Sequence, residues 1–128
     1  MKVSAFEVAS RYVYPSLRRR LVEILRERGL KQGEIAELLH ITQSAVSRYL
    51  KMSRGALIDV RQFSDIEDKL RETAKWIMEE KPSEYEIHKA LIKITVEMLA
   101  KGYVCSFHSK IDPTLNPNEC NVCLEVFQ

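Results

Sequence analysis

The chain has 128 residues, of which 45% are hydrophobic and 30% charged, a balance that suits a domain with an apolar core and argues against a disordered chain. No apolar run approaches the roughly 20 residues that span a bilayer, and the N-terminus lacks the charged and apolar segments of a signal peptide. We therefore expect a cytoplasmic protein with no membrane partner, whose three cysteines stay reduced.

The net charge of +2 conceals an uneven distribution along the chain. Residues 1–64 carry twelve Lys and Arg against six Asp and Glu, a net +6, whereas residues 65–128 carry eight against twelve, a net −4. A basic half can attract a polyanion such as DNA, and an acidic half is unsuited to the same phosphate backbone.

The first predicted helix runs from Pro15 to about Arg28, with Ser16 as its cap. Its inner face is formed by Leu17, Leu21, Ile24 and Leu25. Three consecutive arginines, residues 18–20, lie near its start, where the helix dipole does not favour positive charge. They indicate either a contact with an external anion or a solvated face.

Two short helices joined by a tight turn are predicted between Gln32 and Leu50. The apolar positions that would pack inward are Ile35, Ala36, Leu39, Ile41, Val46, Tyr49 and Leu50. His40 stands where the turn needs a positive φ, which histidine tolerates better than most residues, and Thr42 can cap the second helix. This pattern is that of a helix-turn-helix.

The second helix of this motif has a polar outer face that can enter the major groove of DNA. The residues pointing outward are Gln43, Ser44, Ser47 and Arg48. Gln43 can pair with adenine and Arg48 with guanine, whereas Lys51 and Arg54, just beyond the helix, can reach flanking phosphates.

Two long helices are predicted next, the first starting at Ser64 or Asp65 and ending before Pro82, the second capped by Ser83 and ending at Gly102. Both have more apolar surface than one pairing would hide. We expect them to pair with a second copy of the chain, since two motifs related by a twofold axis read two half-sites. The alternative is that they only complete the core of a monomer.

Four potential metal ligands lie in the last part of the chain. Cys105 and His108 are three residues apart, as are Cys120 and Cys123, and eleven residues join the two pairs. Three thiolates and one imidazole suit a structural zinc site, because four protein ligands leave no open position for a catalytic water. An iron-sulfur cluster is an alternative, which would make the tail a redox sensor, and so is the absence of any metal.

The chain resembles the archaeal predicted transcriptional regulators, a family with a helix-turn-helix similar to the phage-repressor (XRE-like) type. The resemblance is carried by residues 15–25, by the motif at residues 34–55 and by the cysteine and histidine pairs of the tail. It implies a dimeric DNA-binding regulator whose second motif helix enters the major groove. It further implies that Gln43, Ser44, Ser47 and Arg48 face base edges, and that Lys31, Thr42, Lys51 and Arg54 approach phosphates.

Together these features predict an all-α protein with three parts: a helix-turn-helix domain (1–63), a helical dimerisation hairpin (64–102) and a metal-binding tail (103–128). The predicted function is sequence-specific regulation of transcription by a dimer that reads double-stranded DNA with residues 43–50. The alternatives are an iron-sulfur redox-sensing regulator and a protein-interaction module of the transcription machinery. No arrangement of residues typical of an enzyme was found, and the sequence identifies no small-molecule effector.

Overall fold

The computed structural model describes residues 1–52 and 57–128, and within these ranges it contains helices and no strands. The prediction of an all-α fold, with a helix-turn-helix followed by two long helices, is confirmed. In chain order the elements are α1 (Ala5–Val8), the π-helix η1 (Ala9–Val13), α2 (Tyr14–Glu27), α3 (Gln32–Leu39), α4 (Gln43–Lys51), the 3-10 helix η3 (Val60–Gln62), α5 (Ser64–Glu80), α6 (Glu84–Ala100), α7 (Cys105–Ile111) and α8 (Val122–Val126).

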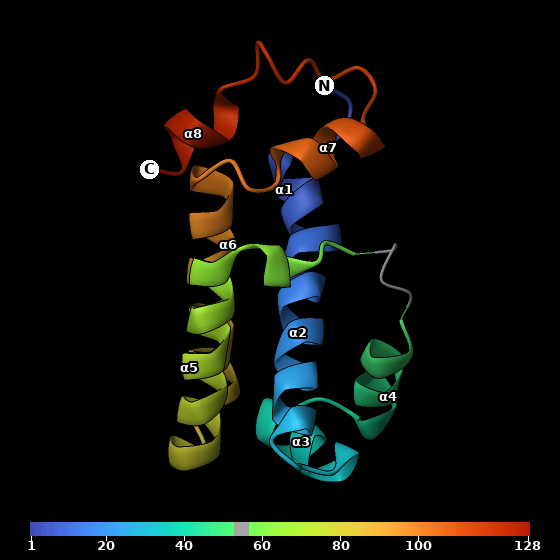
Figure 1. Cartoon of the computed structure of the whole chain (residues 1–128), viewed down its shortest axis with the longest axis vertical. Coiled ribbons are helices and arrows are strands. Elements are labelled where there is room, and N and C mark those ends of the chain that lie inside the picture. Colours follow the sequence, from blue (N-terminus) through green and yellow to red (C-terminus); the bar gives the residue numbers. More distant parts are fainter. Residues whose placement is uncertain (53–56) are drawn as a thin grey trace.

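The first three elements form one continuous helical rod from Ala5 to Glu27 (Figure 1). The Ser4 hydroxyl caps it by accepting a hydrogen bond from the Glu7 amide at 3.2 Å. In turn, the Glu7 carboxylate accepts a hydrogen bond from the Ser4 amide. The prediction that the helix starts at Pro15 is therefore wrong. The π turn, in which the Tyr14 amide bonds to the Ala9 carbonyl, is wider than an α turn and lets the helix continue into proline, whose ring would clash with a normal turn.

Ser16 does not cap the helix as predicted, because it lies inside the rod. Its hydroxyl donates to the Tyr12 carbonyl and accepts a hydrogen bond from the Ile58 amide at 2.9 Å. Ser16 therefore joins α2 to the segment that follows the helix-turn-helix.

The helix α2 is the centre of the molecule and packs against α4, α5 and α6. Its predicted inner face is confirmed, since the four apolar side chains Leu17, Leu21, Ile24 and Leu25 are fully buried. One cluster of buried residues extends from Val8 to Val104 and includes side chains of both the helix-turn-helix and the α5–α6 hairpin. The division into three parts stays a prediction, with a core that the first two parts share.

The α5–α6 hairpin has a predicted cap at the start of α6 and an unpredicted set of hydrogen bonds at Asp65. The Ser83 hydroxyl accepts a hydrogen bond from the Glu86 amide at 3.3 Å, which confirms Ser83 as the cap of α6. Helix α5 starts at Ser64 as predicted, but its cap position is Phe63 and neither Ser64 nor Asp65 caps it with a side chain, as the sequence had suggested. Asp65 instead accepts hydrogen bonds from Lys101 at 2.6 Å and Tyr103 at 3.1 Å, which tie the start of α5 to the end of α6.

The short helices α7 and α8 lie at the end of the molecule opposite the helix-turn-helix, close to both chain termini (Figure 1). The α5–α6 hairpin and α4 flank α2 on opposite sides in the same view. No helix in the described ranges combines the length and apolar character needed to cross a bilayer. The helix-turn-helix and the cysteine-rich tail lie at opposite ends of the helical rod (Figure 1).

Candidate nucleic-acid interface and cysteine-rich tail

The turn between α3 and α4 is formed as predicted. His40 adopts the left-handed conformation with φ 58° and ψ 38°, and the Ile41 amide bonds back to the Ala36 carbonyl at 3.0 Å. The ring nitrogen Nε2 of His40 lies 3.1 Å from the Pro82 carbonyl oxygen. Because a carbonyl only accepts, Nε2 is the donor, and His40 also links the motif's turn to the tip of the α5–α6 hairpin.

Helix α4 begins at the predicted cap, since the Thr42 hydroxyl accepts a hydrogen bond from the Ala45 amide at 3.1 Å. Val46 and Tyr49 turn inward and are buried. The predicted base-facing residues Gln43, Ser44 and Arg48 are exposed, and Ser47 is half-buried. The structure therefore places the four predicted residues on the outer surface of α4 and brings them together there.

The predicted phosphate contacts surround this outer surface. Thr42 and Lys51 are exposed at the two ends of α4, and Lys31 is exposed just before α3. Arg54 lies outside the described residues. Gln43 extends toward the first turn of α3, where its Oε1 lies 3.7 Å from the position that a Cβ at Gly33 would occupy.

The basic side chains that the structure describes on this surface, Lys31, Arg48 and Lys51, are not paired with acids. In the described part of the chain, no carboxylate lies within ion-pair distance of Lys31, Arg48 or Lys51. Other cations of the molecule, such as Arg61 and Lys69, do pair with acids. The positive charge at α4 is therefore available to an external anion.

The three arginines at residues 18–20 do not form one surface cluster. Arg20 is only 6% exposed and binds Glu67 of α5 through two parallel hydrogen bonds of 2.8 Å, with Glu27 and Glu23 nearby. The interpretation of Arg20 as a contact to an external anion is wrong. Arg18 lies 5.2 Å from the centre of the Tyr14 ring, a cation–π contact.

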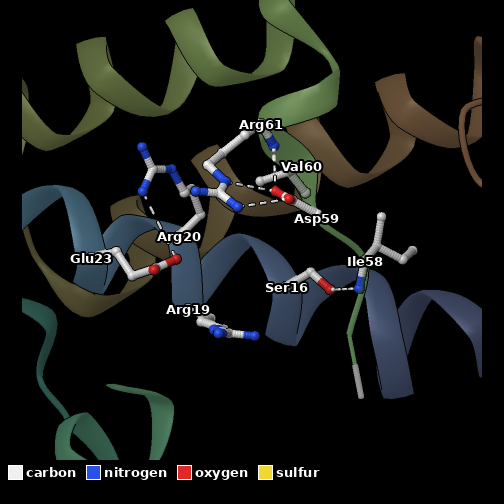
Figure 2. Close-up of a pocket in the computed structure, with 8 residues that line it drawn as sticks. All are labelled: Ser16, Arg19, Arg20, Glu23, Ile58, Asp59, Val60 and Arg61. Atoms are coloured by element: carbon white, nitrogen blue, oxygen red, sulfur yellow. Dashed lines mark hydrogen bonds and ion pairs between the residues drawn. The ribbon is translucent and has the colours of Figure 1, made fainter. Parts of the chain in front are cut away.

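Figure 2 shows the small pocket beside Arg20, where Arg20 points to Glu23, and where Arg61 donates two side-chain hydrogen bonds and one backbone hydrogen bond to Asp59. The hydrogen bonds from Arg20 lower the pKa of Glu67, against the opposing effect of burial. The Glu67 carboxylate in turn raises the pKa of Arg20 above its usual value, mainly through the same hydrogen bonds. The Arg20–Glu67 pair therefore stays ionised and joins α2 to α5.

The four predicted metal ligands of the tail line one pocket, together with Met1 and Leu115 among others. The cysteines are half-buried and His108 is 5% exposed. Burial raises the pKa of the Cys105 and Cys123 thiols, and the nearness of the other thiols adds to this rise. As they lie, no three His, Cys, Asp or Glu side chains of the described residues form a set that could hold a metal ion.

The N-terminal residues belong to this end of the molecule, which the sequence analysis did not predict. His108 Nε2 lies 2.6 Å from the Val3 carbonyl oxygen. The Asp112 carboxylate accepts hydrogen bonds from the Lys2 amide at 2.7 Å and the Val3 amide at 2.9 Å. No pattern in the sequence signals these contacts, because the partners are more than 100 residues apart in the chain.

Helix α2, the left-handed turn at His40 and the exposed face of α4 define a helix-turn-helix protein. Residues 15–55 match the family model described as "Bacterial regulatory protein, arsR family". This segment is less than half of the chain, and it supports the prediction of a DNA-binding transcriptional regulator. The archaeal assignment and the phage-repressor type are not tested by this match and stay predictions. No curated protein and no solved structure matches the chain significantly.

Proposed function

We propose that the protein is a sequence-specific regulator of transcription that binds double-stranded DNA as a dimer, with α4 in the major groove. The observation that supports this most is the outer surface of α4, where exposed polar side chains adjoin basic groups that lack acidic partners within the described ranges. The match of residues 15–55 to a regulator family supports the same assignment.

In this function the side chains on and beside α4 have two kinds of role, base reading and phosphate binding. Gln43 and Arg48 read base edges, since an amide can pair with adenine and a guanidinium with guanine in the major groove. Ser44 and Ser47 provide shorter polar contacts on the same surface. Lys31, Thr42 and Lys51 bind phosphates at its edge, which positions the helix without selecting a sequence.

The variants Arg48→Ala and Lys51→Ala are expected to have different effects on DNA binding. Arg48→Ala should cost about 1–3 kcal/mol on the preferred site and relax the preference at one base pair. Lys51→Ala should weaken binding to all sequences alike and lower the slope of the salt dependence by about one. Both are measured by fluorescence anisotropy on a duplex selected from a random pool and on a scrambled duplex of equal length.

Glu37→Ala is a suitable control, because Glu37 is an exposed side chain of α3 that is not assigned to DNA contact. Its affinity for the preferred site should not fall. If Arg48→Ala loses equal affinity on the preferred and scrambled duplexes, Arg48 does not read a base. If the wild-type chain shows no salt-dependent binding to any duplex, the protein-interaction alternative is favoured.

The proposed dimer uses the outer face of the α5–α6 hairpin. A broad groove between the helices is lined by Trp76, Ala90, Ile94 and Val96. The same groove carries charges of both signs, namely Lys69 and Lys93 with Glu72 and Glu97, so an antiparallel second copy can place opposite charges together.

The substitution Val96→Asp is expected to shift the protein from dimer to monomer by placing a charge in this groove. Sedimentation velocity at micromolar concentration measures this, with Lys75→Asp, an exposed position of α5 outside the groove, as the control. A wild-type chain that sediments only as a monomer would contradict the proposed dimer.

We also propose that the tail carries a structural zinc ion held by Cys105, His108, Cys120 and Cys123. The donor set fits the preference of zinc for sulfur and nitrogen, and the four side chains line one pocket. Metal analysis tests this: one equivalent of zinc in a colourless protein supports the site. Absorption at about 400 nm would instead indicate the iron-sulfur alternative, and no bound metal would contradict both.

A further inference from the structure

We infer that a hollow between the helix-turn-helix and the tip of the α5–α6 hairpin binds an apolar zwitterion, namely an amino acid or a short peptide with a large apolar side chain. A ligand in this hollow contacts the turn that orients α4. Its effect on DNA binding rests on the DNA-binding function proposed above, whereas the site itself does not.

Segments that are distant in the sequence surround this hollow. They are the turn after α2, the helix α3 and the hairpin tip, and they contribute three half-buried apolar side chains, Leu30, Leu38 and Met78. Helix α3 and the hairpin tip lie at the same end of the molecule (Figure 1). The hollow has a volume of about 640 Å³, which lies within the roughly 300–1,000 Å³ of small-molecule sites. It is therefore large enough to hold a small organic ligand.

The lining of the hollow carries charges of both signs. Arg28 and Lys81 contribute cations, and in the described ranges no carboxylate lies within ion-pair distance of either. Glu34 and Glu37 contribute carboxylates from α3, and neither forms an ion pair with a described cation. Charges of both signs beside apolar side chains suit a zwitterion, whose carboxylate meets the two cations and whose ammonium group meets the acids of α3. A ligand with a single charge would face repulsion from one of the two sets.

A hydrogen bond joins the two walls of the hollow. His40 Nε2 donates to the Pro82 carbonyl oxygen at 3.1 Å, and both residues line the hollow. His40 and the neighbour of Pro82, Lys81, both have a positive φ, of 58° and 47°, a conformation that persists only where the surrounding structure holds it. A ligand that contacts both walls therefore favours the arrangement in which the turn at His40 is bound to the hairpin tip.

The hollow is separate from the surface assigned to DNA contact. Helix α4 and the hairpin flank α2 on opposite sides (Figure 1), and none of the residues assigned to DNA lines the hollow. Ligand and DNA can thus bind together. Because the ligand holds the turn that presents α4, it is expected to tighten DNA binding by roughly 5-fold or more, and DNA must tighten ligand binding by the same factor.

The test titrates 15N-labelled wild-type protein with L-leucine and with the dipeptide L-leucyl-L-leucine, and follows the backbone amide signals by NMR. Saturable shifts are expected at Leu30, Leu38 and His40, and not in α7. The tighter of the two probes distinguishes an amino acid from a peptide as the ligand. The acetylated and the amidated form of each probe lack one of the two charges and should bind about 10-fold or more weakly. No saturable shift at the hollow with either probe, or equal binding of the singly charged forms, would overturn the inference.

Arg28→Gln and Arg11→Gln form a matched pair of variants, because both arginines are exposed and only Arg28 lines the hollow. Arg28→Gln is expected to bind the probe about 10-fold more weakly and Arg11→Gln to bind it as the wild type does. Equal affinity in all three proteins would contradict the assigned site. A probe that binds and leaves DNA affinity unchanged would overturn the coupling alone. A chain that binds the probe and no DNA would overturn the DNA-binding function and leave the ligand site standing.

Discussion

Replacing Glu67 with glutamine is expected to lower the free energy of unfolding by about 3 kcal/mol, because it leaves the buried Arg20 charge without its main partner. Arg20 is 6% exposed, and the Glu67 side chain is only 15% exposed. Glutamine keeps the size of the side chain and removes its charge. The loss of stability is measured by urea denaturation at neutral pH. We expect the lower end of the roughly 3–5 kcal/mol range for broken buried pairs, because Arg20 keeps its contact with Glu27 at 3.2 Å.

The effect of Glu67→Gln is also expected to depend on pH. Since Arg20 lowers the pKa of Glu67 in the folded state, the ionised carboxylate stabilises the fold above the unfolded pKa of roughly 4.3. This stabilisation is lost as the pH falls through the lower folded pKa. The difference between wild type and Glu67→Gln should therefore be full near pH 7 and shrink in acid.

Glu79→Gln provides the matched control for this prediction. Glu79 is exposed on the same helix, and its substitution should change the free energy of unfolding by no more than about 0.5 kcal/mol. Equal losses for Glu67→Gln and Glu79→Gln would show that the buried pair does not hold α2 to α5.

Removal of zinc by a chelator is expected to loosen the tail and leave the rest of the fold in place. At a free zinc concentration 1,000-fold above the dissociation constant, bound zinc should stabilise the closed tail by about 4 kcal/mol. Hydrogen exchange measures this as a loss of amide protection in α7 (Cys105–Ile111) and α8 (Val122–Val126) after chelation.

Helix α2 serves as the internal reference for the chelation experiment, because its inner side chains Leu17, Leu21, Ile24 and Leu25 are fully buried. Its protection should change little. Equal protection of α7 and α8 in the presence and absence of zinc would contradict a structural role for the ion.

The helix-turn-helix could be predicted from sequence because its signals are local. Ile35, Ala36 and Leu39 repeat at helical spacing, Thr42 is a strong capping residue, and histidine tolerates the conformation that His40 adopts. Each of these preferences acts within a few residues of the chain. The structure accordingly forms the turn and the exposed surface of α4 as expected.

The features that sequence reasoning missed depend on distant partners or on an uncommon local geometry. Arg20 stands among arginines in the sequence, and only the folded chain brings it to Glu67. A proline such as Pro15 usually marks the start of a helix. Here the π turn before it lets the helix continue through the proline, so the usual rule does not hold. The contact of His108 with Val3 joins residues at the two ends of the chain, which no local pattern can predict.

The central claim, that α4 reads DNA, is tested most directly by binding of the wild-type protein to a duplex selected from a random pool, at salt concentrations between about 50 and 200 mM. We predict that the logarithm of the binding constant falls linearly with the logarithm of the salt concentration. The selected duplex should be bound about 1,000-fold or more tightly than a random sequence. Equal affinity for selected and random duplexes, or no binding at any salt concentration, would contradict it.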